Sequence, residues 1–420
     1  MLLTALAAAQ VQPNFAPIPS SFGINSANPV YALDVEYDNV DQNKQVFHLF
    51  LPDTTGTYPL VIFIHGGGFT GGSPDQVLNN ATLRADIKYF LENGIAYASM
   101  GYRLLETTQA DNEGVIKCLN DSKRGLQFIR HYSNDLFIDP KKIALKGSSA
   151  GAGTSFWLGT RSDMAEAGAT DPVLQNSTRV CATALNGSQA TYDLYKWETQ
   201  VYQNFDGQGT TFTLDSIENH LGFNRGSNFY GGYDSARQIL HDPALIQYRQ
   251  EVDMLFHLSA DDAPIYMSSP STAVHPSDDL FHHPFHGREI QQAAIAANLS
   301  EVKANIPALS INTTQGETQN EFLKRHLDNC AQTNHINTSK TSGDLNLYPN
   351  PANDLITVHV GKGNIKDVEI YNLNLERMIQ FQGKNAAKLS FTVSELPSGT
   401  YLIQIKNDLG EVFWEKISIK

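Results

Sequence analysis

The chain has few cysteines, which limits how covalent links or metals can hold it together. Among its 420 residues there are three, Cys118, Cys181 and Cys330, and they cannot all pair within one molecule. Cys118 lies in a helical pattern and Cys181 in an apolar stretch with strand character. We therefore expect both to be buried small hydrophobic residues. Their spacings fit neither a disulfide framework nor a zinc site, and the sequence predicts no bound metal.

Basic charge is also scarce. The 30 Lys and Arg residues are outnumbered by 44 Asp and Glu residues, which gives a formal net charge of −14. No cluster of Lys or Arg interrupts this acidic composition. Nucleic acid is therefore excluded as an expected partner.

Long apolar runs are missing as well. None reaches the length of a membrane span, so no stable span is expected. The first residues, Met1 to Ala9, are apolar and small, and their alanine-rich end is similar to a signal-peptide cleavage site. The charged start of such a segment is absent, so residues 1–20 fit either a truncated signal segment or an ordinary apolar start. We favour the signal segment because the pattern of the C-terminal part also points to export.

The stretch Gly147–Gly151 reads Gly-Ser-Ser-Ala-Gly. A short apolar run, Lys142–Lys146, comes before it, and a run that can begin a helix follows it. Strand, Gly-x-Ser-x-Gly and helix together are the context of a nucleophile elbow, a turn so tight that side chains two positions from the serine would collide with backbone. The pattern predicts that Ser149 is a nucleophile.

A second glycine motif, His65-Gly66-Gly67-Gly68-Phe69, follows the apolar run Leu60–Ile64. Glycines directly after a buried strand allow main-chain N–H groups to approach a ligand closely. We expect the N–H groups of Gly66, Gly67 and Ala150 to stabilise the oxyanion of a tetrahedral intermediate. A phosphate loop is excluded because its G-x-x-x-x-G-K-[ST] spacing is absent.

Together these motifs resemble the α/β-hydrolase family, in its esterase and lipase branch with the HGGG-type oxyanion loop. Tyr102-Arg103-Leu104, Asp139-Pro140 and Ser149-Ala150-Gly151-Ala152 are similar to further motifs of that family. The resemblance implies a doubly wound, mostly parallel sheet covered by helices, and it implies no cofactor.

The order of apolar runs agrees with this fold. An antiparallel hairpin opens the chain, and strands then alternate with helices, so we expect residues 21–328 to form an α/β catalytic domain. Residues 188–253, rich in Tyr, Phe and Trp, interrupt the alternation. The resemblance implies that this insertion lies over the active site as a cap. Most of its rings are expected in the cap's own core and a few around an apolar pocket.

The C-terminal part has a different pattern. Residues 329–344 are rich in Asn, Thr and Ser and predict a linker. Residues 345–420 contain short alternating strands separated by turns, which predict a small all-β sandwich domain. Tyr348-Pro349-Asn350-Pro351-Ala352 and Leu396-Pro397-Ser398-Gly399-Thr400-Tyr401 are similar to motifs of the C-terminal sorting domain of the type IX secretion system. That resemblance implies export across the outer membrane and a partner in the secretion machinery.

A serine nucleophile needs a base and an acid that orients the base. The resemblance places the acid after the predicted strand Pro264–Met267, where Asp278 and Asp279 are the candidates, and we favour Asp279 because it directly precedes the next helix. It places the histidine after the last predicted strand, Ile306–Ile311, but no histidine follows there. The alternatives are a base from the cluster His282, His283 and His286, with His283 favoured, the later His326, or no working base.

The sequence as a whole favours a secreted serine esterase or lipase, extracellular or on the outer-membrane surface. It would form an acyl-enzyme with a small-molecule or polymeric ester such as an acylated polysaccharide, a lipid or a polyester. A catalytically silent binding protein on the same fold, or a peptidase, remains as the alternative.

Overall fold

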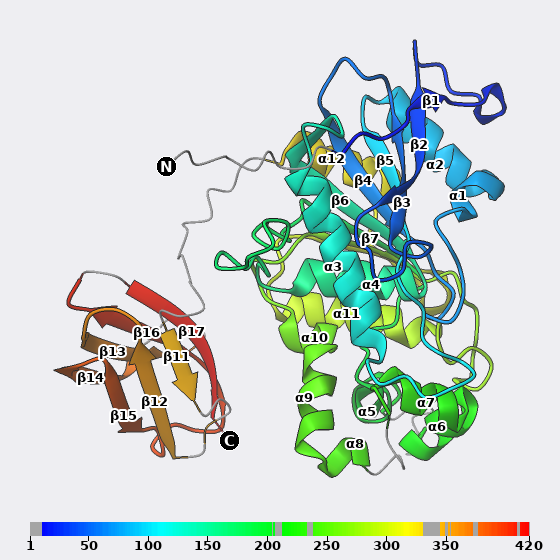
Figure 1. Cartoon of the computed structure of the whole chain (residues 1–420). Helices are drawn as coiled ribbons and strands as arrows, with labels where there is room; N and C mark the ends of the chain where they lie inside the picture. The colour runs from blue at the N-terminus through cyan, green and yellow to red at the C-terminus, as the bar shows by residue number, and fades with distance from the viewer. Residues whose placement is uncertain are drawn as a thin grey trace, which may run out of the picture. The chain divides into compact units, whose positions relative to one another are not determined.

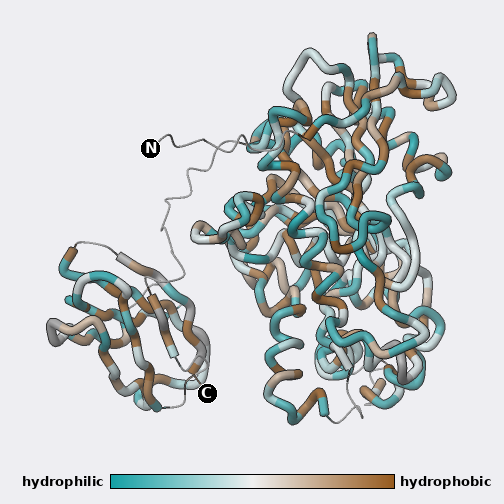
Figure 2. The backbone as a smooth tube through the Cα atoms, in the orientation of Figure 1, coloured by the Kyte–Doolittle hydropathy of each residue, from teal (hydrophilic) through white to brown (hydrophobic). Residues whose placement is uncertain are grey.

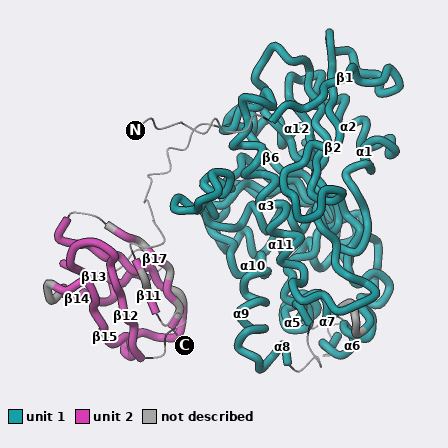
Figure 3. The backbone as a smooth tube through the Cα atoms, viewed as in Figure 1, with its two compact units in different colours: residues 1–330 teal, residues 331–420 magenta. Residues whose placement is uncertain are grey.

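The computed structural model describes residues 11–203, 205, 212–232, 238–330, 345–348, 352, 354–372, 377–409 and 412–419. The chain forms two compact units, residues 1–330 and 331–420 (Figures 1 and 3). Half of the predicted signal segment, residues 1–10, and most of the predicted linker, residues 331–344, lie outside the described residues.

Unit 1 is built on a ten-stranded sheet with the order β1-β2-β3-β5-β4-β6-β7-β8-β9-β10. Strands β5, β4, β6, β7, β8 and β9 are parallel, whereas β1 to β3 and β10 pair antiparallel at the two edges. The strands are β1 (Ala16–Pro17), β2 (Val30–Glu36), β3 (Val46–Leu51), β4 (Tyr58–Ile64), β5 (Ala96–Met100), β6 (Ile138–Ser148), β7 (Thr183–Asn186), β8 (Ile265–Ser268), β9 (Val302–Ile306) and β10 (Ile311–Asn312). The predicted opening hairpin and the mostly parallel sheet are confirmed.

Helices cover both faces of this sheet (Figure 1). The α-helices of unit 1 are α1 (Gln76–Asn79), α2 (Ala81–Glu92), α3 (Val115–His131), α4 (Ala150–Thr160), α5 (Leu194–Lys196), α6 (Leu214–Leu221), α7 (Phe223–Phe229), α8 (Gln238–His241), α9 (Pro243–Glu251), α10 (Met254–His257), α11 (Pro284–Ala296) and α12 (Gln319–Asp328). The other helical turns are η1 (Ser20–Phe22), the π-helical η2 (Trp197–Val201) and η3 (Pro307–Leu309).

Strand β4 is apolar at every position from Leu60 to Ile64 because both of its faces are buried. Its residues Leu60, Ile62 and Ile64 belong to one core cluster, which includes side chains of α3 and α4. Val61 and Phe63 belong to a second cluster, with side chains of α2 and α12. A parallel strand buried on both faces needs apolar residues at every position. Figure 2 shows the resulting hydrophobic segments through the middle of unit 1.

The end of the sheet differs from the prediction. The last parallel strand is β9, which stops at Ile306, and the predicted strand Ile306–Ile311 instead contains the turn η3 and the start of β10. Pro307 has no N–H to donate to the ladder, and Ser310 has a left-handed backbone (φ 56°). The chain therefore turns back here, and β10 pairs antiparallel with β9.

The cysteine prediction is corrected in one respect. Cys181 and Cys330 form a disulfide across 149 residues of sequence, whereas Cys181 was expected to be an unpaired buried residue. Helix α12 packs on β6 and β7, which returns the end of unit 1 to the start of β7. Cys118 is free and buried, as predicted.

Unit 2 consists of two antiparallel sheets with the orders β11-β12-β15 and β14-β13-β16-β17. Its strands are β11 (Leu345–Tyr348), β12 (Leu355–Val360), β13 (Ile365–Tyr371), β14 (Arg377–Ala386), β15 (Lys388–Thr392), β16 (Gly399–Asn407) and β17 (Val412–Ile419). Ile356 and Val358 of one sheet share a buried cluster with Val368 and Ile370 of the other. The unit is therefore a small sandwich.

Candidate active site

Ser149 lies at the sharp turn between β6 and α4. Its backbone has φ 52° and ψ −121°, a conformation that a non-glycine residue rarely adopts. A Cβ on Gly147 would lie 2.1 Å from the Gly151 carbonyl oxygen, and one on Gly151 would lie 2.0 Å from that of Ile64. Both glycines are required by the close approach of backbone, as the motif predicted, and the turn presents the Ser149 hydroxyl to the pocket beside it.

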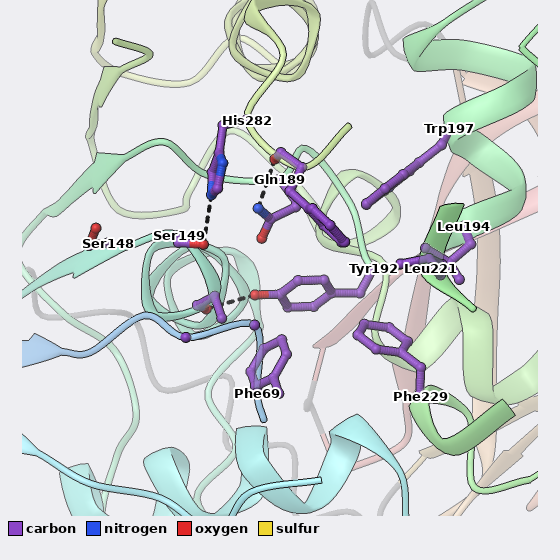
Figure 4. A pocket seen from close by; sticks show the side chains of 14 residues that line it. Phe69, Ser148, Ser149, Gln189, Tyr192, Leu194, Trp197, Leu221, Phe229 and His282 are labelled. Atoms are coloured by element: carbon purple, nitrogen blue, oxygen red, sulfur yellow. Dashed lines mark hydrogen bonds between the residues drawn. The ribbon is translucent and has the colours of Figure 1, made fainter. Parts of the chain in front are cut away.

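A histidine and an aspartate continue from Ser149 in one chain of hydrogen bonds. The Ser149 Oγ is 2.8 Å from His282 Nε2, and His282 Nδ1 is 3.1 Å from Asp279 Oδ1 (Figure 4). An ionised carboxylate only accepts, so Nδ1 carries the proton and Nε2 is left to accept from the serine. This is the hydrogen-bond order of a serine–histidine–acid triad.

Asp279 is fixed on both of its oxygens. Its Oδ1 also accepts from the backbone N–H of His282 at 3.2 Å, and its Oδ2 accepts from the Ser271 hydroxyl at 2.8 Å. Partial burial alone would raise the pKa of this carboxyl group. The hydrogen bond from Ser271 and the neighbouring His282 outweigh burial, so the pKa of Asp279 is below its ordinary value.

The structure corrects the choice among the histidines. His283, favoured from the sequence, points away from Ser149: its Nδ1 accepts from the Phe285 N–H at the start of α11, and its Nε2 lies 3.4 Å from the Val274 carbonyl. His326 on α12 pairs with Glu301 at 3.0 Å. Adjacent residues of this turn face opposite ways, which the sequence alone does not reveal.

His286 and Asp278 also lie away from the serine. His286 is fully buried between Ala190, Tyr202 and Leu280, and an oxygen of Asp278 accepts from the backbone N–H of His275. The structure thus brings together Ser149, His282 and Asp279. The spacing Asp-x-x-His was the available signal for this pair.

The glycine loop borders the same pocket. Gly67, Gly68 and Ala150 line it beside Ser149, whereas Gly66 packs against the backbone of Ser148. The Gly66 carbonyl oxygen lies 2.7 Å from Nδ1 of His65, which fixes the peptide joining Gly66 to Gly67. In a trans peptide the N–H points opposite to the carbonyl, so the Gly67 N–H is turned away from His65.

The pocket has a volume of about 500 Å³ and a mostly apolar wall. Phe69 packs edge-on against Tyr192 and Phe229, with ring centroids 5.3 and 6.1 Å apart. The remaining lining side chains are those of Ser148, Gln189, Leu194, Trp197, Leu221, Phe281 and His282, and Figure 4 labels all of these except Phe281. The expected division of the cap's rings is visible here: Tyr192, Trp197 and Phe229 line the pocket, whereas Tyr202 and Tyr230 are buried outside its lining.

Two buried histidines near the site make stability depend on pH. Burial lowers the pKa of His65 to about 4 and that of His286 to about 3. In the unfolded chain these groups bind protons near pH 6.5. As the pH falls from 6.5 towards 4, only the unfolded state gains these protons. The free energy of unfolding is therefore expected to fall by up to about 1.4 kcal/mol per pH unit for each histidine.

Urea unfolding of unit 1 at pH 7, 6 and 5 measures this slope, in a range where ordinary carboxylates remain ionised in both states. His286→Gln should flatten the dependence. A slope that is the same in His286→Gln and in the wild type would show that His286 is not held neutral.

Each of the two units contains a segment that matches a known protein family. Residues 47–220 match the family BD-FAE, and residues 346–420 match the secretion system C-terminal sorting domain. The chain joins an α/β-hydrolase domain of the esterase type to a type IX sorting domain. The second match spans the sandwich of unit 2 and indicates export from the cell. Within the described residues, no helix has the length and apolar character needed to cross a membrane.

Solved structures resemble the α/β-hydrolase unit only distantly. A truncated carbohydrate esterase from gut microbiota is 13% identical, with a TM-score of 0.47, over 71% of this chain and 96% of that chain. Esterase B from Lactobacillus rhamnosis is 16% identical, with a TM-score of 0.46, over 72% and 87%. An acetyl ester-xyloside bifunctional hydrolase from Caldicellulosiruptor lactoaceticus is 15% identical, with a TM-score of 0.42, over 77% and 97%. No curated protein sequence matches the chain.

Proposed function

We propose that the protein is an exported serine carboxyl-ester hydrolase that acts outside the cell or on its outer surface. The observation that carries this proposal is the hydrogen-bonded series Ser149, His282 and Asp279 beside an apolar pocket. The sorting domain supports the location. The alternative of a silent binding protein was motivated by the missing histidine after the last predicted strand, and the hydrogen bond between Ser149 and His282 argues against it.

In the proposed reaction, His282 Nε2 takes the proton of Ser149 as its oxygen attacks the acyl carbon. The oxyanion is stabilised by N–H groups of the glycine loop and of Ala150, in the preorganised manner that makes such donors effective. His282 then gives the proton to the leaving alcohol, which leaves an acyl group on Ser149. Water, activated by the same histidine, releases the acid and restores the serine.

The lining of the pocket favours esters with a planar apolar group. The aromatic side chains of Phe69, Tyr192, Trp197, Phe229 and Phe281 surround the space next to Ser149. Rings of this kind bind a flat apolar group through edge and face contacts. We infer that one portion of the substrate is aromatic or similarly flat. Extracellular polymers that carry such acyl groups, including acylated polysaccharides, fit this inference.

A substrate panel tests the proposal. The methyl ester of 3-phenylpropanoic acid should be hydrolysed with a kcat/KM at least about tenfold above that of methyl acetate, because its ring gains contacts in the pocket. Phe229→Ala should remove most of this preference and leave the smaller ester unaffected. Leucine 4-nitroanilide should not be cleaved. Cleavage of the anilide without turnover of either ester would instead support the peptidase alternative.

A further inference from the structure

The acid and the base of this site are carried by one short segment. Asp279 and His282 are three residues apart between β8 and α11, and the residues between them are Leu280 and Phe281. The family resemblance placed the histidine on a different loop, after the last strand. Here the position of a single segment, residues 279–282, sets two of the three groups of the triad relative to Ser149.

The carbonyl group of Leu280 is held from two directions. The hydroxyl group of Tyr202 donates to it at 2.6 Å, and Nε2 of His286 lies 3.0 Å from it. Because Nδ1 of His286 accepts from the backbone N–H of Ala190 at 3.2 Å, its proton must be on Nε2, and the ring is a donor to Leu280. Burial keeps this histidine neutral, with its pKa lowered to about 3.

The next carbonyl group, that of Phe281, is held by Gln189. The side-chain Nε2 of Gln189 donates to it at 2.8 Å. Figure 4 marks this hydrogen bond by a dashed line from Gln189. The ring of Phe281 belongs to the pocket wall, and the following residue is His282. The same short segment therefore touches the substrate pocket with one side chain and supplies the base with the next.

Two of these donors, Tyr202 and Gln189, belong to the cap insertion and are shielded from water. Gln189 lies a few residues after β7 and Tyr202 directly after η2, and their relative exposures are 5% and 0%. A buried hydrogen bond is directional and costly to leave unmade. The segment that carries the acid and base is thus fixed by side chains that the cap provides.

We propose that Tyr202 and Gln189 are positioning residues, which hold the consecutive carbonyl groups of Leu280 and Phe281 and thereby fix His282 at hydrogen-bonding distance from Ser149. The proposal rests on the proposed ester hydrolysis. It gives the cap a second role besides closing the pocket, because cap side chains set the alignment of the triad.

Tyr202→Phe removes only the hydroxyl group and tests this role. It should lower kcat about tenfold, the effect of one buried hydrogen bond, and should leave KM within about twofold. Gln189→Met removes the second donor, and the double variant should lose at least about thirtyfold in kcat. The rate at which a small methylphosphonate ester modifies Ser149 should fall in parallel, because that reaction needs the aligned base but little of the pocket.

Tyr248→Phe is the matched control. The Tyr248 hydroxyl accepts from the Ile116 N–H, donates to the Glu113 carbonyl and lies 3.4 Å from the Phe229 carbonyl. It therefore joins α9 to the start of α3 and the end of α7 without touching the segment 279–282. This variant should lose a similar amount of thermal stability and keep the wild-type kcat. Equal losses of kcat in Tyr202→Phe and Tyr248→Phe would mean that Tyr202 has only a structural role.

The outcomes separate the two proposals. If Ser149→Ala is inactive but Tyr202→Phe and Gln189→Met keep the wild-type kcat and phosphonylation rate, the positioning proposal is overturned and ester hydrolysis stands. If Ser149→Ala remains active on esters, the proposed function itself fails. Should Tyr202→Phe not fold, Gln189→Met alone decides, and an unchanged phosphonylation rate in that variant overturns the proposal.

Discussion

Replacing Ser149 with alanine is expected to lower kcat for a 4-nitrophenyl ester by about 10⁵-fold, because no other group can form the acyl-enzyme. Alanine removes one oxygen, and that oxygen's hydrogen-bond partner is the partly exposed His282. The shape of the elbow depends on Gly147 and Gly151, which this substitution leaves in place. The variant should therefore keep the wild-type melting temperature.

Ser148→Ala is the matched control, since it changes the neighbouring serine in the same turn. Its kcat should stay within about tenfold of the wild type. A comparable collapse of activity in both variants would mean that the elbow cannot tolerate substitution and that the nucleophile is not identified by this test. Activity retained in Ser149→Ala would exclude the acyl-enzyme mechanism.

The two adjacent histidines are expected to differ strongly in their effect on activity. His282→Ala should lower kcat by about 10⁵-fold, since the serine loses the base that accepts its proton. His283→Ala should change kcat at most about threefold. Its main effect should be a loss of about 1 kcal/mol in stability, because the His283 ring accepts the Phe285 N–H at the start of α11.

Steady-state kinetics and thermal unfolding of both variants measure this difference. Each substitution removes a similar ring from neighbouring positions of one turn, so each controls for the other. The reverse result, a large loss of kcat in His283→Ala with little effect in His282→Ala, would contradict the hydrogen-bond geometry at Ser149.

The sequence predicted those parts of the site that depend on local backbone chemistry. Gly147 and Gly151 are needed because the turn around Ser149 leaves no space for a Cβ, and such a requirement is visible in five residues. The apolar runs Leu60–Ile64 and Lys142–Lys146 were also visible, and they lie within strands β4 and β6. These features are fixed by neighbours in sequence.

The base was predicted only as a member of a cluster. Asp279 and the group His282, His283 and His286 were recognised, but which ring faces Ser149 depends on how the turn is held by Tyr202 and Gln189, from the distant insertion. The disulfide between Cys181 and Cys330 was missed for a similar reason, since its cysteines meet only after α12 packs on the sheet.

The strands of unit 2 show where the alternation of apolar and polar residues predicts a strand and where it fails to. The alternation over Ile356–Val360 predicts a strand, and strand β12 covers Leu355–Val360. Strand β14, Arg377–Ala386, includes Gly383 and several polar residues, and it was not predicted. A Cβ on Gly383 would lie 1.7 Å from the Ile365 carbonyl oxygen, beside a shift in the pairing of β13 with β14. The close approach of the partner strand, which the sequence does not show, explains this glycine.

The most direct test of the central claim is the reaction of the protein with a fluorophosphonate, followed by mapping of the modified peptide by mass spectrometry. The claim is that His282 and Asp279 activate Ser149. It predicts one adduct per chain, on Ser149, formed at a wild-type rate in His283→Ala and at least about 10³-fold more slowly in His282→Ala. An adduct on Ser148, or modification of Ser149 at an unchanged rate without His282, would contradict it.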